Sequence, residues 1–159
     1  MTTTTRPETT IEAHPDLPLV TITREFDAPP ALVYRAWTEP DLVRQWMGPR
    51  SVEMDIEVWD CRTGGSYRYI HRRGDDEYAF RGCFHEVREN DLIIQTFTFE
   101  GMPDGVALEK LVLEDLPGGR CRLTATSLVD SFADRDAFVA SGMEDGVRQG
   151  YERLDAIVA

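Results

Sequence analysis

The strongest constraint on the fold is a series of short segments between residues 52 and 128 in which apolar and polar residues alternate. Alternation with a period of two puts every second side chain on one face, which is typical of a strand with one buried and one wet face. The gaps between segments are short and rich in Gly, Pro, Asn and Asp, so successive strands are expected to pair as antiparallel hairpins. The predicted strands of this region are 52–58, 66–72, 78–87, 92–99, 106–114 and 120–128.

A further strand and two short helices are predicted ahead of this series. Residues 1–16 are rich in Thr, Pro and acidic residues and show no apolar period, so we expect a flexible tail before a single domain at 17–159. Alternation over 19–26 predicts another strand, and the Pro pair at 29–30 suits the first turn of a helix. The apolar positions of the two helices are Leu32, Val33, Ala36 and Trp37 in the first and Leu42, Val43, Trp46 and Met47 in the second.

The C-terminal part of the chain has the apolar spacing of helices. A short helix is predicted at 132–140, and the run from Ser141 to Glu144 has the pattern of a capping box that begins a longer helix. The apolar stripe of this last helix consists of Met143, Val147, Gly150, Tyr151, Leu154, Ile157 and Val158. Such a stripe needs a sheet to cover, so we predict an α+β fold in which about six to seven antiparallel strands pack on the helix.

The composition fits a single acidic domain. The 159 residues are 42% hydrophobic, enough for one well-buried core, and they include 17 Lys plus Arg against 29 Asp plus Glu. The resulting net charge of -12 would repel phosphate backbones and anionic lipid surfaces, so neither nucleic acid nor a membrane is expected as a partner. Arg68, Arg72 and Arg73 form a local basic group, for which a solvated strand face is the expected place.

The three cysteines, Cys61, Cys83 and Cys121, lie far apart and form no pair of metal-ligand spacing, which favours reduced thiols. No apolar stretch is long enough to cross a bilayer, and the first residues lack the apolar core of a signal peptide. A cytoplasmic location is therefore expected. The sequence also lacks phosphate loops, nucleotide-binding fingerprints and metal-ligand clusters, so no cofactor and no metal are predicted.

Several motifs resemble those of one protein superfamily. Near the N-terminus these are Phe26-Asp27-Ala28-Pro29-Pro30, Val33-Tyr34-Arg35-Ala36-Trp37-Thr38-Glu39-Pro40 and Gln45-Trp46-Met47-Gly48-Pro49. Further along they are Gly64-Gly65-Ser66-Tyr67-Arg68-Tyr69, Phe80-Arg81-Gly82, and Gly142-Met143 with Tyr151-Glu152-Arg153-Leu154. Over about residues 19–159 the chain resembles the SRPBCC or START-like superfamily, and within it the branch of proteins similar to the activator of the heat-shock-protein-90 ATPase.

The resemblance implies a helix-grip fold, in which a curved antiparallel sheet closes over one long C-terminal helix and encloses a cavity. Across the superfamily that cavity takes lipids, polyketides and other apolar molecules. A shared scaffold does not define an activity, so the function of this chain has to be argued from its own residues.

Two histidines of the predicted strands, His71 and His85, are weak candidates for acid or base catalysis. His71 shares strand parity with Tyr67 and Tyr69, which makes it a candidate for lining a cavity wall. His85 shares parity with Cys83, but same-face neighbours on one strand are about 7 Å apart, too far for direct proton transfer, so structural packing is expected of Cys83. Carboxylates gather in turns and on polar helix faces, where solubility is their expected role. No catalytic residue is therefore assigned.

The aromatic residues are more informative about function. Tyrosine hydroxyls orient a ligand while their rings pack against it, and the chain has more rings than a small core requires. By analogy with the superfamily, Tyr67, Tyr69 and Tyr151 belong to the sheet centre and its covering helix, where core packing and cavity lining both stay open. The full set of predicted cavity residues is Tyr67, Tyr69, His71, Phe80, Phe97, Met143, Val147 and Tyr151.

Three functions remain open from the sequence. The favoured one is binding of a small apolar or aromatic molecule, because no acid–base constellation stands out. The alternative is an enzyme of the polyketide cyclase or dehydratase kind that acts in the same cavity, and a weaker one is a chaperone-interaction role resembling the ATPase activator. The sequence does not name the ligand or a protein partner, and it leaves the oligomeric state, a homodimer included, undecided.

Overall fold

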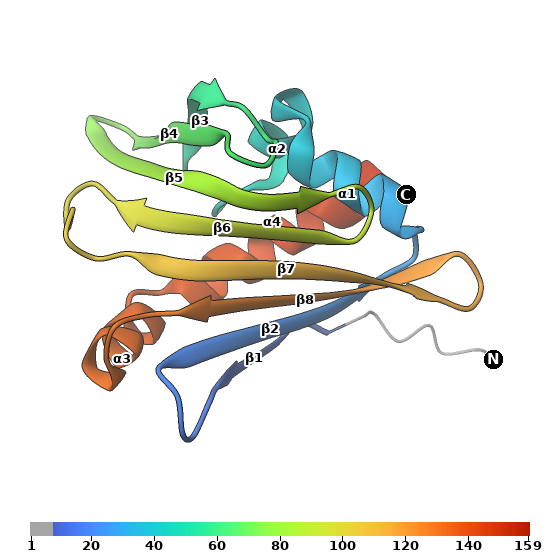
Figure 1. The fold of residues 1–159 in the computed structure, drawn as a ribbon. Helices are drawn as coiled ribbons and strands as arrows, with labels where there is room; N and C mark the ends of the chain where they lie inside the picture. The colour runs from blue at the N-terminus through green and yellow to red at the C-terminus, as the bar shows by residue number, and fades with distance from the viewer. Residues whose placement is uncertain (1–7) are drawn as a thin grey trace.

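Residues 8–159 are described by the computed structural model, and they form an eight-stranded antiparallel sheet with four helices (Figure 1). The strands are β1 (Thr10–Ala13), β2 (Leu19–Phe26), β3 (Glu53–Trp59), β4 (Ser66–Arg73), β5 (Asp76–Arg88), β6 (Leu92–Phe99), β7 (Ala107–Leu116) and β8 (Arg120–Leu128). The helices are α1 (Pro30–Thr38), α2 (Pro40–Trp46), α3 (Phe132–Ala140) and α4 (Met143–Val158). Strands β3 to β8 form one meander, and β2 and β1 extend the sheet beyond β8. The α+β helix-grip arrangement predicted from the sequence is confirmed.

The N-terminal segment differs from the prediction. Thr10–Ala13, inside the expected tail of residues 1–16, is strand β1 and pairs with β2 through Ile11 opposite Ile22. The sheet therefore has eight described strands, one more than the upper end of the prediction. A four-residue edge strand with one half-buried apolar side chain is too short to show alternation, which is why it was missed. Residues 1–7 of the expected tail lie outside the described residues.

The helices agree with the prediction, but the cap of α4 does not. Gly142 is its N-cap, with φ of 86° and no side-chain cap, and the Ser141 hydroxyl donates instead to the Phe138 carbonyl. Glycine adopts this left-handed conformation without strain, so it turns the chain between α3 and α4. The side-chain cap of this region belongs to α3, where Ser131 Oγ accepts a hydrogen bond from the Asp134 N–H at 3.1 Å.

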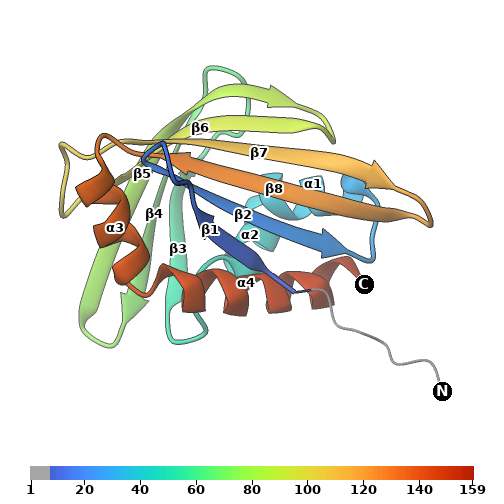
Figure 2. The same ribbon diagram turned by 90° about the horizontal axis from the view of Figure 1, so that it is seen from below.

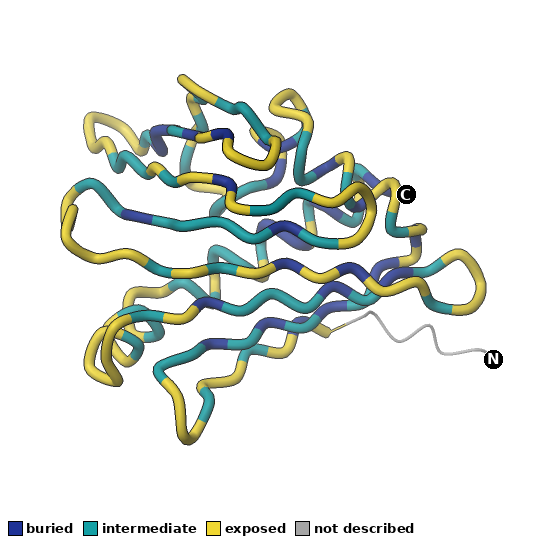
Figure 3. The backbone as a smooth tube through the Cα atoms, in the orientation of Figure 1, coloured by how far each residue is buried: buried dark blue, intermediate teal, exposed yellow. Residues whose placement is uncertain are grey.

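The sheet is curved, and α4 lies against its concave face. Figure 2 shows α4 crossing the open side of the sheet, and α1 and α2 both contact it. The register shifts between Ile56 and Val58 of β3 and between Phe84 and Glu86 of β5, and such irregularities bend the strand that carries them. In Figure 3 the more buried positions recur at every second residue along β2 and β7, and the residues between them on β7 are exposed, as expected for strands with one covered face and one wet face.

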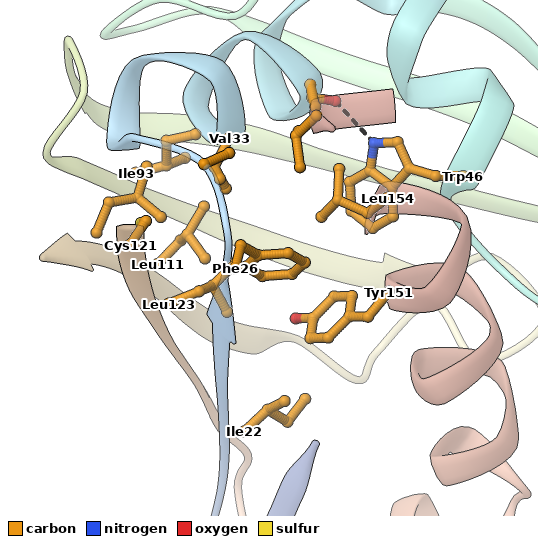
Figure 4. Close-up of a cluster of buried hydrophobic side chains, with 14 of the residues drawn as sticks. Ile22, Phe26, Val33, Trp46, Ile93, Leu111, Cys121, Leu123, Tyr151 and Leu154 are labelled. Atoms are coloured by element: carbon orange, nitrogen blue, oxygen red, sulfur yellow. Dashed lines mark hydrogen bonds between the residues drawn. The ribbon is translucent and has the colours of Figure 1, made fainter. Parts of the chain in front are cut away.

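The C-terminal half of α4 covers a closely packed core (Figure 4). Its Tyr151 and Leu154 pack with Phe26 of β2, and Trp46 of α2 joins the same cluster. The Tyr151 and Phe26 rings meet edge to face with centroids 5.8 Å apart, and the Trp46 Nε1–H donates to the Ala36 carbonyl at 2.8 Å. Side chains therefore fill the interior beneath the C-terminal half of α4.

Candidate ligand-binding site

Strand β4 presents three of the predicted site residues on the concave face. Tyr67, Tyr69 and His71 are 2%, 5% and 8% exposed, because alternation puts all three on the covered side of the strand. The Tyr67 and Tyr69 rings stack with centroids 6.0 Å apart, and the Tyr69 and His71 ring centroids are 5.0 Å apart. The three side chains form a continuous row of rings along β4.

Two phenylalanines of neighbouring strands extend this row. Phe80 of β5 stacks on Tyr69, with ring centroids 5.2 Å apart, and on Phe97 of β6, with centroids 5.3 Å apart. Both phenylalanines pack against the buried core yet keep partial exposure. The structure thus brings Tyr67, Tyr69, His71, Phe80 and Phe97 together, and we refer to these five residues as the aromatic cluster.

Helix α4 carries the other three predicted residues, and they differ in burial. Tyr151 is 4% exposed and belongs to the closely packed half of the interior. Val147 and Met143, one and two turns nearer the N-terminus, pack against the core but keep partial exposure. The interior is therefore more tightly closed beneath the C-terminal half of α4 than beneath its N-terminal half.

A polar row, absent from the sequence-based expectations, crosses the concave face. Gln95 of β6, Glu109 of β7 and Ser127 of β8 are cross-strand partners in register, so their side chains lie next to one another. The Glu109 carboxylate accepts hydrogen bonds from Gln95 Nε2 at 3.2 Å and from the Ser127 hydroxyl at 2.6 Å. Burial raises the pKa of the Glu109 carboxyl, and the two donors act against this rise. These three residues put an acid into an interior that is otherwise largely apolar.

Tyr67 joins the polar row to the aromatic cluster. Its hydroxyl accepts a hydrogen bond from Gln95 Nε2 at 3.3 Å and donates one to the Thr96 carbonyl at 2.6 Å. This reach across β5 depends on Gly82, because a Cβ there would lie 2.6 Å from the Tyr67 hydroxyl oxygen and 2.0 Å from the Thr96 carbonyl oxygen. The Tyr67 hydroxyl is therefore satisfied within the protein and holds the Gln95 amide in place.

Two other tyrosine hydroxyls of the interior lack such partners. Within residues 8–159, neither the Tyr69 nor the Tyr151 hydroxyl makes a hydrogen bond, although both residues are almost fully buried. Burial raises the pKa of both phenols, and the nearby Glu109 carboxylate adds to the rise, so the hydroxyls keep their protons. Neither hydroxyl oxygen belongs to the fully buried, unpartnered polar atoms of the described residues, so both keep some contact with solvent and are available to a polar group that enters the interior.

His71 lies at one end of the aromatic cluster, close to Gly48 and Arg153. Burial, with a smaller contribution from the Arg153 guanidinium, lowers the pKa of its imidazole to about 4. Its Nε2 has no hydrogen-bond partner within the described part of the chain, and a Cβ on Gly48 would lie 2.7 Å from its Cε1. A general base works best when its pKa lies near neutral pH. The low pKa of His71 and its close contact with Gly48 therefore favour a packing role.

The second candidate histidine lies outside the interior. His85 and its neighbour Cys83 are both exposed on β5, and the buried residue between them is Phe84. The expectation that Cys83 packs in the core is wrong, because strand parity turns its thiol outward while its N–H donates to Thr96 Oγ1 at 2.9 Å. His85 therefore does not join the other predicted site residues.

The alternation of residues along β7 could have predicted the inward position of Glu109 from the sequence. Glu109 shares the parity of Ala107, Leu111 and Leu113, so an acid occupies an inward position of an alternating strand. Carboxylates were expected only in turns and on polar helix faces, and Glu109 corrects that expectation. An acid between aliphatic residues at two-residue spacing predicts a buried carboxyl, a feature that occurs frequently in functional sites.

Two surface pockets lie away from these residues. One, of about 470 Å³, lies between the start of α1 and the turn after β5, and the other, of about 240 Å³, lies beside β1 and β2. None of the predicted cavity residues lines either pocket, so neither is the cavity expected between α4 and the sheet. That cavity stays a prediction, and the partial exposure under the N-terminal half of α4 supports it.

The described residues contain neither a metal centre nor a membrane-spanning helix. Within residues 8–159, no three His, Cys, Asp or Glu side chains are grouped so that they could hold a metal ion. No helix of that range combines the length and the apolar character needed to cross a bilayer.

The curved sheet, the covering helix and the aromatic interior together define a helix-grip domain. The sequence matches the family described as Activator of Hsp90 ATPase homolog 1-like protein over residues 27–159, and the chain belongs to this family. A comparison with curated proteins gave no match.

Solved structures of other proteins share the fold. A solution structure from Arthrobacter aurescens has a TM-score of 0.85 at 25% identity, and the match covers 94% of this chain and 90% of that one. A crystal structure from Mycobacterium smegmatis has a TM-score of 0.85 at 22% identity, covering 96% of this chain and 98% of that one. A crystal structure from Chromobacterium violaceum has a TM-score of 0.77 at 25% identity, covering 88% and 96%.

Proposed function

We propose that this protein binds a small apolar or aromatic molecule between α4 and the concave face of the sheet. The observation that carries the proposal is the pair of unpaired hydroxyls of Tyr69 and Tyr151, which belong to almost fully buried side chains but keep some contact with solvent, in an interior rich in rings. Rings supply apolar contact area, and a few fixed polar groups orient the bound molecule. In Figure 4 the Tyr151 hydroxyl points from α4 toward the sheet, and Tyr151 lies at the middle of the helix, where the closely packed half of the interior ends.

Differences in burial support a site under the N-terminal half of α4. Met143 and Val147 keep partial exposure there, whereas Leu154 and Val158 at the other end of the helix are buried. Phe97 is also partly exposed, so the sheet and the helix are incompletely closed at the same end. Binding of an apolar molecule over these side chains removes apolar surface from water, which is favourable.

Thermal shift with a panel of aromatic molecules tests this proposal. A ligand of the folded state raises the Tm with the logarithm of its concentration, because only the folded chain offers the site. Tyr69→Phe and Tyr151→Phe keep the ring and remove the hydroxyl, so each should weaken binding by about 1 to 2 kcal/mol. Tyr34→Phe on α1 is the matched control, since its half-buried ring lies outside the proposed site and its loss of a hydroxyl should leave affinity unchanged.

A panel in which no aromatic molecule raises the Tm contradicts the proposal. So does a ligand whose affinity falls equally in the Tyr34 variant and in the Tyr69 and Tyr151 variants. Binding that is insensitive to all three changes would locate the ligand elsewhere on the protein.

The Glu109 carboxyl supports a second candidate, an enzyme of the cyclase or dehydratase kind. A half-buried acid with a raised pKa beside tyrosine rings is a group that can exchange protons with a bound molecule. Mass spectrometry of the molecule recovered after incubation separates the two functions. An unchanged mass supports binding, and loss of water that requires Glu109 supports the enzyme.

A further inference from the structure

The Glu109 carboxylate has no positively charged partner. Within residues 8–159 its hydrogen-bond partners are the neutral Gln95 amide and Ser127 hydroxyl, and no Arg, Lys or His nitrogen lies within 4.0 Å of it. Arg24, the buried arginine, binds both carboxylate oxygens of Asp155 instead. Glu109 is half-buried, and carboxylates drawn into a protein interior are normally paired with a cation, so the described chain leaves this acid without its usual counter-charge.

The hydrogen bonds that Glu109 accepts stabilise its ionised form and act against the rise in pKa that burial causes. The Thr96 carbonyl only accepts, so the Tyr67 hydroxyl donates its hydrogen to it and accepts a hydrogen bond from the Gln95 amide. That amide therefore presents its N–H groups to Tyr67 and to Glu109, and Ser127 donates to the other carboxylate oxygen. Each oxygen accepts one bond, while a carboxylate has about four acceptor positions in total. Further donors from a ligand can be accommodated.

The surroundings of this acid favour a cation over an anion. Tyr67, Tyr69 and Phe80 present stacked rings in the same interior, and the faces of aromatic rings attract organic cations. The net charge of -12 adds a long-range attraction for cations and a repulsion for anions.

We infer that the ligand is an organic amine whose ammonium group pairs with Glu109 while its apolar part packs on the aromatic cluster. The inference rests on the proposed function, because it names the ligand class of that same site. An ammonium group supplies the missing positive charge, and its N–H groups fit the acceptor positions that Gln95 and Ser127 leave open.

Three probes of one skeleton and different charge test the ligand class. They are 2-phenylethylamine, 2-phenylethanol and phenylacetate, each titrated by thermal shift and calorimetry against the wild type. The amine should bind about 10- to 100-fold more tightly than the alcohol, the ratio expected for a hydrogen bond to a charged group, and phenylacetate should bind most weakly. In Glu109→Gln the amine should lose this advantage while the alcohol keeps its affinity. Glu114→Gln, on the outer face of the same strand, is the charge-matched control and should preserve the ratio.

The outcomes separate the inference from the proposed function. Equal binding of amine and alcohol to the wild type overturns the inference and leaves the proposed function standing. Tighter binding of phenylacetate also overturns it. Failure of all three probes and of the wider aromatic panel overturns both. Should Glu109→Gln fail to fold, N-acetyl-2-phenylethylamine decides in the wild type, because it keeps the skeleton without the charge and should bind about as weakly as the alcohol.

Discussion

Arg24 of β2 and Asp155 of α4 form a bidentate ion pair that joins the last helix to the sheet. Nη1 and Nη2 lie 2.6 Å and 2.5 Å from the two carboxylate oxygens, and the arginine side chain is only 4% exposed. The guanidinium also lies 4.6 Å from the centroid of the Phe26 ring. A charge buried this deeply depends on its partner, because without it an unpaired guanidinium remains in the interior.

Removal of the partner should therefore destabilise the fold. We expect Asp155→Asn to lower the free energy of unfolding by about 1 to 3 kcal/mol, less than for a fully buried pair because Asp155 is 40% exposed. Urea unfolding measures the loss. Glu39→Gln breaks the exposed Arg35–Glu39 pair and should change the free energy very little. Equal losses in the two variants would show that burial of Arg24 is not what gives the pair its value.

The pH dependence of stability should report His71. Burial and the Arg153 guanidinium lower the pKa of its imidazole to about 4, whereas a histidine in an unfolded chain titrates near about 6.5. Protonation therefore favours the unfolded chain. The stability that the neutral ring contributes is complete above about pH 6.5 and is lost as the pH falls toward about 4, by about 3 kcal/mol in total.

Urea unfolding of the wild type and of His71→Gln at several pH values between about 7 and 4 measures this contribution. Other groups titrate alike in both proteins, so the wild type should lose about 2 to 3 kcal/mol more than the variant over this range. His85→Gln, at an exposed position, should follow the wild-type curve. Parallel curves for the wild type and His71→Gln would contradict a buried, neutral His71.

The Tyr67 side chain passes over Gly82 of β5 to reach Thr96 of β6, so Gly82 should not tolerate a side chain. A Cβ at this position would lie 2.0 Å from the Thr96 carbonyl oxygen, which is backbone and has little freedom to move. We expect Gly82→Ala to lower the free energy of unfolding by about 2 kcal/mol or more, as over-packing of a core does. Gly105→Ala is the control, because the nearest atom to a Cβ there is 3.5 Å away. A neutral Gly82→Ala would mean that Tyr67 does not reach Thr96 in solution.

Leu154 should carry much of the contact between α4 and the sheet. It is fully buried in the cluster with Phe26, so truncation to Ala leaves a cavity as well as lost apolar contact. We expect a loss of about 2 to 5 kcal/mol in the free energy of unfolding. Leu32→Ala on α1, where the leucine is exposed, should have a small effect in the same urea titration. A loss well under 1 kcal/mol for Leu154→Ala would mean that α4 does not close the sheet.

Much of the fold was predictable because it depends on periodicity. Alternation along the chain predicted every long strand, and apolar spacing predicted α4 and the burial of Leu154. Features shorter than one period were missed, as with β1, which has a single apolar contact at Ile11. The start of α4 was assigned to a serine cap because Gly142 acts through a backbone conformation and not through a side-chain pattern.

The candidate site was predictable in its apolar part only. Parity along β4 grouped Tyr67 and Tyr69, and the structure places both on the covered face. Glu109 was missed because charged residues were expected at the surface, although its position in the alternation of β7 places it on the covered face. The contact between Tyr67 and Gln95 depends on the pairing of three strands in register, which one sequence does not state. Which hydroxyls stay unpaired follows from that pairing and was equally inaccessible.

The central claim is that a ligand lies under the N-terminal half of α4, and methionine methyl NMR tests it most directly. Met143 belongs to that half, and Met102, 68% exposed on the loop after β6, is an internal control. Protein with labelled methionine methyl groups is titrated with the aryl probe that raises the Tm most. The Met143 signal should shift and saturate at the Kd obtained by calorimetry while the Met102 signal stays in place. Saturation of binding without any change at Met143 would contradict the proposed site.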